Sequence, residues 1–578
     1  MGKDYDIAYF EEALKEAQEK CLSKAPKLKT SHRKLFVAAC QVFYDAFEES
    51  KSAATEKDAA EGAKAQQKAM KKCVKAANKI FEKLDMAENE KYEAAMLKGA
   101  VITQATPAGL AEFSSQDKKN GKVVDHLLKS PSLMKEMLMY GGAAEGKYGQ
   151  AMKIYTKILA GFPEEDDQYT DVNRKIAMAV ALELASPITE FDTKVEVDPF
   201  DRYKHYESAY KNGELDPAFP HFTIWELRHV INCDAPNDQL AWARRMLINY
   251  SPYQTTLTDL KQRYLYILET DVLMRNPSWT ASPRTYQQVL SGGGKDGPNA
   301  WFGRFICKAH GIPTWGCKQK GRTALTRWTP TGWEAMQGAD WDICAWNGVS
   351  GIDFKGEVDA RSAHSPEQYY SKLVLLECMA EVMDGRRGEI SEEELTILHP
   401  NRVWRSLAII QKALMLEPAS PESFERSGES GVKTWGEQYL DIYNKDEPDN
   451  ACTVEGDVIT IPAGCKGFHD GNVMLIASFL GGLQLNFLAD GVVEFEVPDV
   501  AYPKKYTLKL LVNTVHLKQS PLKLKIDEDD EILIEVPYTV GEWQETKGVE
   551  VELSGGKIMR FKRERPSFGL AIKKLMLS

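Results

Sequence analysis

The sequence lacks any long apolar run and any apolar leader. None of its 578 residues falls in a stretch as long as the roughly twenty apolar residues that a membrane-spanning helix needs. The opening residues, MGKDYDIAYFEEALKEAQ, carry acids where a signal peptide needs an apolar segment. We therefore expect a soluble chain that has no membrane partner and stays in the cytoplasm.

The motifs that bind common cofactors are also missing. There is no phosphate loop, no Rossmann fingerprint, no HExxH and no zinc spacing, and the ten cysteines include no CxxC pair. In GGGKDGPNA, the acid Asp296 at the start of a helix would repel a phosphate. We expect no metal and no cofactor, although the acidic turn Asp527-Glu528-Asp529-Asp530 fits a calcium ligand set as well as a solvated hairpin. Cys452 and Cys465 flank a predicted strand, and two free thiols are favoured over a disulfide.

Positive charge is in deficit. The formal net charge is -11, which argues against general nucleic-acid binding, because that function needs a basic surface. The one basic run, KAMKKCVKAANK, has no large aromatic or aliphatic anchors, so a solvated helix face is the favoured interpretation. With 43% hydrophobic and 27% charged residues, the composition is that of an ordinary globular protein.

Helical spacing dominates residues 1–190. Apolar residues recur every three or four positions from Ile7 to Cys21, from Leu35 to Phe47, from Tyr148 to Leu159 and from Ile176 to Leu184. Between Ala53 and Leu84 the sequence is rich in Ala, Lys and Glu, which predicts a long, partly solvated helix. The first third of the chain is therefore expected to be a helical region.

The stretch from Gly292 to Trp333 predicts a turn, a helix and two strands. Asp296 with Gly297-Pro298 is a strong helix start, and Gly311-Ile312-Pro313 ends the helix after His310. Thr314 to Cys317 and Thr323 to Trp328 then fit two strands around a Gln319-Lys320-Gly321 turn.

This order of a Gly-rich loop, a helix, "GIP", a strand, "GR-T-A" and "W-T-P-x-G-W" resembles the core of the transglutaminase-like superfamily, relatives of papain-type cysteine hydrolases. The resemblance implies a nucleophilic Cys at the position of Asp296 and an activating His at the position of Arg322, with Asp340 as the nearest match to the third catalytic residue. A carboxylate is a poor replacement for a thiolate, and arginine cannot act as a general base. The resemblance thus implies the fold without the usual reaction. Two interpretations stay open: Asp296 and Arg322 form an ion pair, or they are an N-cap and a solvated turn residue.

Five tryptophans near this stretch are candidates for a ligand cleft, because such rings stack on sugars and peptides, although burial in the core is the more frequent role. They are Trp301, Trp315, Trp328, Trp333 and Trp341.

Other candidate groups are weaker. Glu226, Arg228 and His229 in WELRH suit a structural role, since neighbouring helix residues point in different directions. Cys307, with His310 on the same helix face, and Cys317 are the thiols that a rearranged cysteine hydrolase would use.

From Thr453 onward the period changes to that of short strands, and Asp490-Gly491 predicts a hairpin turn between two of them. The last 70 residues or so resemble jelly-roll carbohydrate-binding modules through a Thr-x-Gly-x-Trp segment, formed here by Thr539, Gly541 and Trp543. The resemblance implies an antiparallel β-sandwich and makes Trp543 a candidate for sugar binding.

We therefore predict an α+β protein. Its parts are a helical N-terminal region (1–190), a transglutaminase-like, papain-type core with flanking helices (191–416), a linker (417–452) and a C-terminal antiparallel β-sandwich or jelly roll (453–578). The favoured function is that of a catalytically inactive binding or structural protein with a glycan or peptide ligand. The alternatives are an active cysteine hydrolase or acyltransferase with a rearranged nucleophile, and an oligomeric assembly protein that associates through its long Ala/Lys/Glu helix.

Overall fold

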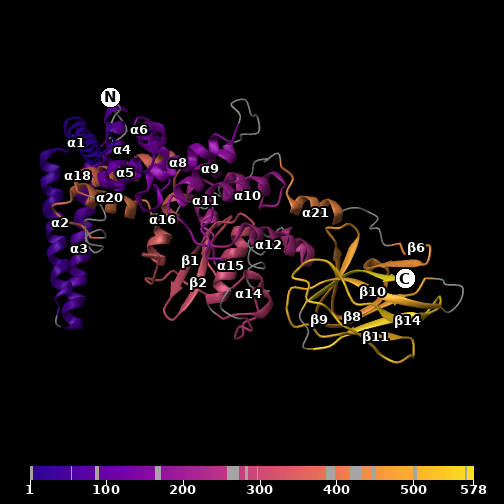
Figure 1. Cartoon of the computed structure of the whole chain (residues 1–578). Helices are drawn as coiled ribbons and strands as arrows, with labels where there is room; N and C mark the ends of the chain where they lie inside the picture. The colour runs from indigo at the N-terminus through magenta and orange to yellow at the C-terminus, as the bar shows by residue number, and fades with distance from the viewer. Residues whose placement is uncertain are drawn as a thin grey trace.

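Helices fill one end of the molecule and strands the other in the computed structural model (Figure 1). The structure describes residues 4–53, 55–84, 90–162, 171–256, 272–279, 284–295, 297–385, 397–416, 432–443, 451–498, 504–565 and 569–578. The α+β class is confirmed, with a helical N-terminal region and a C-terminal antiparallel sheet.

Some of the N-terminal helices begin at a residue whose side chain caps them. The side chain of Asp6 accepts from the backbone N–H of Tyr9, and that of Thr55 accepts from Asp58. The helical segments expected from the apolar spacing are confirmed. The helices are α1 (Ile7–Lys24), α2 (Thr30–Lys51), α3 (Glu56–Phe81), α4 (Glu90–Ala105), α5 (Pro107–Gln116), α6 (Asn120–Leu128), α7 (Pro131–Met139), α8 (Tyr148–Leu159) and α9 (Asp171–Glu183).

The middle of the chain combines helices with a small antiparallel sheet. The helix and the strands expected between Gly292 and Trp333 are confirmed, and Gly311 ends the helix with a φ of 77°, which favours glycine. In the sheet Cys317 lies opposite Ala324, and Trp328 lies opposite Trp333. The elements are α10 (Pro199–Lys211), α11 (Ile224–Ile231), α12 (Asn237–Tyr250), α14 (Tyr286–Gly292), α15 (Gly297–Ala309), β1 (Thr314–Gln319), β2 (Arg322–Thr329) and β3 (Gly332–Ala335).

The next segment of the chain folds back onto the N-terminal helices. A short hairpin of β4 (Ala345–Trp346) and β5 (Val349–Ser350) leads into α16 (Gly351–Ala363), α17 (Pro366–Tyr369), a π-helical turn (Tyr370–Val374), α18 (Leu375–Met383) and α20 (Val403–Leu414). Helix α18 packs beside α1 and α4, where Gln18 donates to the carbonyl of Val382 at 3.3 Å. Figure 1 shows α18 and α20 among the first helices of the chain. One apolar cluster consequently runs through both segments, from Phe10 to Met415.

Helix α21 (Trp435–Tyr443) precedes the strands, which form an antiparallel sandwich around a separate apolar core. In the described residues the strand order is β12-β11-β15-β9-β16-β10-β13. In addition, β14 pairs with β10, β7 with β16, β6 with β7, and β8 with β9. The strands are β6 (Thr453–Glu455), β7 (Val458–Pro462), β8 (Lys466–Ala477), β9 (Leu483–Glu496), β10 (Lys504–Asn513), β11 (Leu522–Ile526), β12 (Ile532–Ile534), β13 (Gln544–Glu545), β14 (Val549–Leu553), β15 (Ile558–Arg563) and β16 (Leu570–Leu577).

The hairpin turn predicted at Asp490-Gly491 is wrong. Both residues lie inside β9, which pairs with β8 along most of its length. A Cβ on Gly491 would come within 2.6 Å of the Val473 side chain, so this glycine permits a close approach of β8. The register between the two strands shifts there, after Gly471, and β9 then pairs with β15 in place of β16. The glycine therefore serves a bulge and not a turn.

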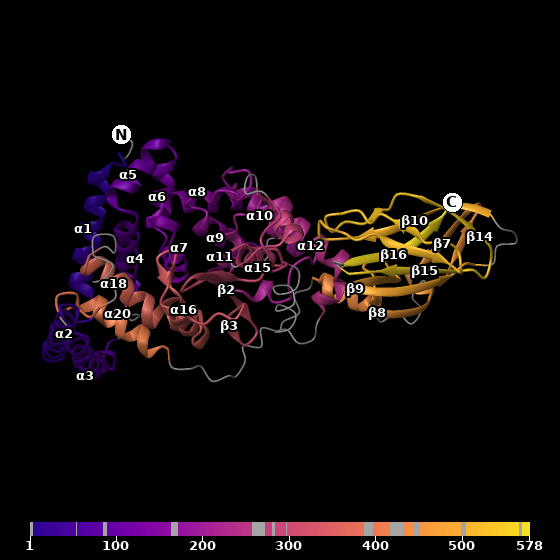
Figure 2. The same ribbon diagram turned by 90° about the horizontal axis from the view of Figure 1, so that it is seen from below.

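The sandwich joins the rest of the molecule at the C-terminal end of α12 (Figure 2). The indole N–H of Trp242 donates to the carbonyl of Val540 at 2.6 Å, and the side-chain amide of Asn486 donates to the carbonyl of Tyr250 at 2.7 Å. Throughout the described ranges, the helices are too short or too polar to cross a membrane.

Candidate functional site

A cavity of about 730 Å³ lies where the first helices, the small sheet and the returning helices meet. Its wall comes from the loop between α7 and α8, from α11, from β1 and from α16, α18 and α20. The residues that line it are Gln104, Leu138, Gly141, Gly142, Ala143, Glu145, Gly146, Trp225, His229, Trp315, Val349, Asp353, Phe354, Glu357, Arg361, Val374, Glu377, Cys378, Glu381 and Lys412.

Aromatic rings form one wall of this cavity. The rings of Trp315 and Phe354 are parallel within 5°, with centroids 4.3 Å apart. Phe354 also stacks on Trp225, with a centroid separation of 6.0 Å. Stacked rings bury a large area and hold each other rigidly. Phe354 is itself buried between its neighbours, so it fixes the partly exposed Trp315, which is the ring of this pair that a ligand can reach.

A network of fixed charges faces the aromatic wall. The carboxylate of Glu357 accepts from Arg361 at 2.7 Å, from Lys412 at 2.6 Å and from the Tyr369 hydroxyl at 2.7 Å. Burial alone would raise the pKa of Glu357, but the two cations outweigh burial and hold the pKa well below its ordinary value. Glu357 therefore stays ionised and cannot act as an acid near neutral pH.

The loop after α7 is held in place by Arg228. This side chain donates to the carbonyls of Tyr140 and Gly142 at 2.7 and 2.8 Å and pairs with Glu183 at 2.9 Å. Burial lowers the pKa of the neighbouring His229 to about 4, so its ring is neutral at physiological pH.

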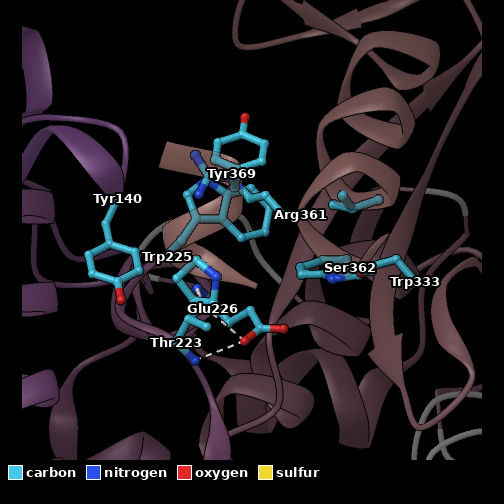
Figure 3. A pocket seen from close by; sticks show the side chains of 10 residues that line it. Tyr140, Thr223, Trp225, Glu226, Trp333, Arg361, Ser362 and Tyr369 are labelled. Atoms are coloured by element: carbon cyan, nitrogen blue, oxygen red, sulfur yellow. Dashed lines mark hydrogen bonds between the residues drawn. The ribbon is translucent and has the colours of Figure 1, made fainter. Parts of the chain in front are cut away.

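A small pocket lies on the other side of Trp225 and Arg361 (Figure 3). The Arg361 guanidinium stands 4.2 Å from the Tyr369 ring centre and 4.9 Å from that of Trp225. At the pocket's edge Glu226 caps α11 by accepting from the N–H of Thr223 at 2.9 Å, as the dashed line in Figure 3 marks. In WELRH, Glu226 and Arg228 thus make structural contacts, and His229 lines the large cavity.

The five candidate tryptophans do not share one cleft. Trp315 lines the large cavity and Trp333 lines the small pocket, while Trp341 lies 6.4 Å from Phe354. Trp328 is buried against Phe222, and the ring of Trp301 lies under the guanidinium of Arg284 at 4.2 Å.

Of the three positions that the resemblance equates with a catalytic triad, the structure describes those of Arg322 and Asp340. Asp296 lies outside the described residues. Arg322 is exposed and donates to the carbonyls of Gln337, at 3.0 Å, and Gly338. Asp340 is also exposed, and its backbone carbonyl accepts from the side chain of Gln319 at 2.6 Å. Neither described residue lines the large cavity.

The thiols near the small sheet are shielded. Burial raises the pKa of Cys307 to about 12 and also raises the pKa of Cys317. Burial lowers the pKa of His310 to about 4, and its Nδ1 lies 3.0 Å from the carbonyl of Ile306. A thiolate is the reactive form of cysteine, so these environments suppress nucleophilic chemistry.

In the sandwich, the segment of Thr539, Gly541 and Trp543 adjoins the junction with α12. A Cβ on Gly541 would approach a side-chain atom of Met246 to 2.3 Å, and Glu542 pairs with Arg245 at 3.2 Å. Trp543 is half-buried directly after this contact. The acidic turn from Asp527 to Asp530 connects β11 with β12, and Asp527 accepts from the N–H of Ile558 at 2.9 Å. Cys452 and Cys465 are free thiols with their Sγ atoms 3.3 Å apart.

Sequence reasoning missed most of the cavity wall. Phe354, Glu357 and Arg361 lie on α16, a helix that was not predicted, and Lys412 lies on α20, one of the helices expected to flank the core. The 3–4 residue spacing of Phe354, Glu357 and Arg361 does put them on one helix face, which is the signal that a closer reading could have used.

No protein-family model matches the chain, and neither does any curated protein. Solved structures that resemble part of it include the C-terminal CBM6 of LamC, a laminarinase from Zobellia galactanivorans, at 15% identity over 21% of this chain and 98% of that chain, with a TM-score of 0.18. A family 35 carbohydrate-binding module from Clostridium thermocellum matches at 16% identity over 21% of this chain and 96% of that one, with a TM-score of 0.18. An exo-beta-1,3-galactanase from Phanerochaete chrysosporium matches at 13% identity over 21% of this chain and 28% of that one, also with a TM-score of 0.18. Scores this low carry no argument, and the description of the sandwich rests on its strand pairing.

Proposed function

We propose that this chain is a non-catalytic binding protein whose ligand occupies the large cavity between the first helices and the small sheet. The observation that carries the proposal is the stacked pair of Trp315 and Phe354 in the wall of a cavity of about 730 Å³. Ligand sites are typically concave, of a few hundred Å³, and carry precisely placed polar groups that fix the orientation of the ligand. The charge network of Glu357, Arg361 and Lys412 provides such polar groups.

The ligand that fits this lining best is a glycan. A sugar ring has an apolar C–H face that packs on an aromatic ring, and hydroxyls that both donate and accept hydrogen bonds. The ring of Trp315, held in place by the buried Phe354, can pack on the C–H face of the sugar. The carboxylates of the cavity, together with Arg361 and Lys412, can bond to the hydroxyls. A peptide with an aromatic or charged side chain is the second candidate for the same surface.

The proposal includes a transglutaminase-like scaffold that has lost its reaction. Helix α15 followed by the antiparallel strands β1, β2 and β3 is the element order that the resemblance implies. Arg322 at the position of the general base bonds to backbone carbonyls, and arginine stays protonated. The raised pKa values of Cys307 and Cys317 weigh against the rival, a cysteine hydrolase with a rearranged nucleophile.

The test is a glycan and peptide array with the intact protein, followed by titration calorimetry with the best probe. We expect binding that Trp315→Ala weakens by at least about tenfold, since removing a well-packed aromatic contact costs at least about 1–2 kcal/mol. Trp435→Ala removes the same ring from α21, away from the cavity, and is the matched control. Binding that both variants weaken equally would reject the cavity as the site. Loss of binding after iodoacetamide treatment, with hydrolysis of an amide or ester probe, would favour the cysteine hydrolase.

A further inference from the structure

Helix α2 carries an exposed seam with the spacing of a coiled coil. Every third or fourth residue from Ser31 to Glu49 faces solvent, and within this seam Leu35 and Val42 are 47% and 48% exposed. The opposite side of the helix packs on α3 through Phe36, Cys40 and Phe43. Figure 1 shows the hairpin of α2 and α3 at the edge of the molecule, with its lower part projecting from the other helices. The seam residues are Ser31, Leu35, Ala38, Val42, Asp45 and Glu49.

Charges divide sharply along this hairpin. Residues 27–44 hold four cations and no acid, namely Lys27, Lys29, Arg33 and Lys34. Residues 45–49 hold three acids and no cation, namely Asp45, Glu48 and Glu49. On α3, residues 68–81 lie beside the cationic half of α2, because Gln66 already donates to the carbonyl of Ala46, and they contain five lysines and no acid; together with residues 27–44 they form the stem of the hairpin. The stem of the hairpin is therefore basic, and the part of α2 near the tip is acidic.

This order of charges opposes the dipole of α2. The N-terminal end of a helix favours acids and its C-terminal end favours cations. Helix α2 has Arg33 in its first turn and Glu48 and Glu49 near its end, no side chain caps its N-terminus, and only Lys51 in its last turn follows the dipole. Two other helices offset a lysine with an acid one turn away, in the pairs Lys129–Asp125 and Lys355–Asp359. The charges of α2 are therefore arranged for a contact outside the helix.

We infer that the α2 seam is the interface of a homodimer in which the hairpins of two copies lie antiparallel. A two-fold axis midway between Leu35 and Val42 places Leu35 of each copy against Val42 of the other. The same axis brings the cationic stem of one α2 beside the acidic residues of the other, twice. The antiparallel pairing also opposes the two helix dipoles, which is favourable. A closed two-fold contact of this kind is self-complementary and stops at two copies.

A second copy fits this seam better than a polyanion such as nucleic acid. A linear polyanion lying along α2 would meet the cations of the stem and then the acids from Asp45 to Glu49. A second, antiparallel copy places acids beside the cationic stem and cations beside the acidic residues of α2. The dimer face is distant in sequence from the cavity, and no residue of the seam lines the cavity. The inference can therefore be tested independently of the proposed function.

The first measurement is the molar mass of the full chain by sedimentation equilibrium over a range of protein and salt concentrations. We expect the mass to move from 64.9 kDa toward twice that value as protein concentration rises, and to fall again as salt screens the charges. A mass of 64.9 kDa at all concentrations up to about 100 µM, roughly the range in which specific interfaces assemble, would overturn the inference.

Charge reversal identifies the face. The stem variant Arg33→Glu with Lys34→Glu and the tip variant Asp45→Lys with Glu49→Lys each bring like charges together, and each should dimerise at least about tenfold more weakly than the wild type. An equimolar mixture of the two restores opposite charges at both contacts and should form a 1:1 heterodimer. All four positions are exposed, and unchanged thermal unfolding confirms that the variants fold. Dimers that survive in both variants, or a mixture that stays monomeric, would place any association on another surface.

Discussion

The body of the molecule, meaning the helices and the small sheet that precede β6, buries many more charged side chains than the sandwich, where Arg563 is the buried charged residue among those described. The body buries charged side chains within its apolar cluster, as with Arg202 and Arg244, which are 0% and 2% exposed. The core of the sandwich is built from apolar residues of alternating strands, and its ion pairs, such as Lys523 with Glu564, lie at the surface. Its buried polar residues Gln484 and Asn486 donate to backbone carbonyls of α12, at the junction.

This difference explains why the cavity lies in the body. A sheet packed on a sheet fills its interior with interlocking side chains. In the body, three segments of the chain meet around Glu357 and Arg361. These two side chains must keep their hydrogen-bond partners, so they do not pack into the apolar core, and the cavity lies beside them. Four measurements test this contrast between the two regions.

The largest expected effect is on stability, from a buried cation. Arg202 donates to the carbonyls of Ile231, Cys233 and Ala235 at 2.7 to 3.0 Å. Arg202→Ala leaves these buried acceptors without a donor and should cost about 3–5 kcal/mol of unfolding free energy. Lys523→Ala, at the sandwich surface, should cost less than about 1 kcal/mol. Denaturant unfolding of the two variants measures both values, and equal losses would show that the body is no more sensitive than the sandwich.

Acid should weaken the body more than the sandwich, because burial lowers the pKa of both His229 and His310 to about 4 in the body, whereas His516 is the corresponding histidine in the described part of the sandwich. The pKa of His310 falls from an ordinary 6.5 to about 4 in the folded chain, so only the unfolded chain takes up a proton in that window, and about 3 kcal/mol is lost as the pH falls from 6.5 to 4. Lys523 and Lys562 hold the pKa of the exposed Glu564 at about 2, so the stability from that pair is present above pH 4.5 and is lost only as the pH falls toward 2.

Calorimetric unfolding from pH 7 to pH 3 measures this difference. In His310→Phe the stability should depend less steeply on pH between 6.5 and 4, because the group that titrates is gone. An unchanged slope would mean that His310 does not supply the effect.

Removing an aromatic ring from the cavity should cost about 1–2 kcal/mol more binding free energy than removing one from the sandwich. Trp315→Ala removes part of the cavity wall, whereas Trp543→Ala removes a half-buried ring beside the junction. We expect the first to weaken binding by at least about tenfold and the second by less than about twofold. The reverse order, measured by titration calorimetry with one glycan probe, would move the binding site to the sandwich.

The smallest expected effect concerns the junction. Trp242→Phe removes the hydrogen bond from the indole N–H to the carbonyl of Val540 and keeps most of the ring's packing. The loss should be about 1 kcal/mol, seen as a wider separation between the unfolding transitions of body and sandwich. Trp328→Phe, within the body, is the control that should leave this separation unchanged.

Local patterns in the sequence determined most of the secondary structure of this protein. Apolar residues at helical spacing and capping side chains such as Asp6 and Thr55 act between neighbours along the chain, so α1, α3 and α8 follow from the sequence alone. The same holds for the change to strands after Thr453. The turn predicted at Asp490-Gly491 was wrong because glycine suits a β-bulge as well as a turn, and only the pairing with the partner strand decides which of the two forms.

The tertiary structure alone decided where the cavity lies. Trp225, Trp315, Glu357 and Lys412 are far apart in sequence and meet only because α16, α18 and α20 return to the first helices. Nothing local encodes that return, since it depends on which apolar faces bury each other best over the whole chain. The sequence suggested the same role for Trp315 and Trp328, but the fold buries Trp328 in the core and places Trp315 on the cavity wall. The packing of the surrounding helices and strands decides how much space is left beside each ring.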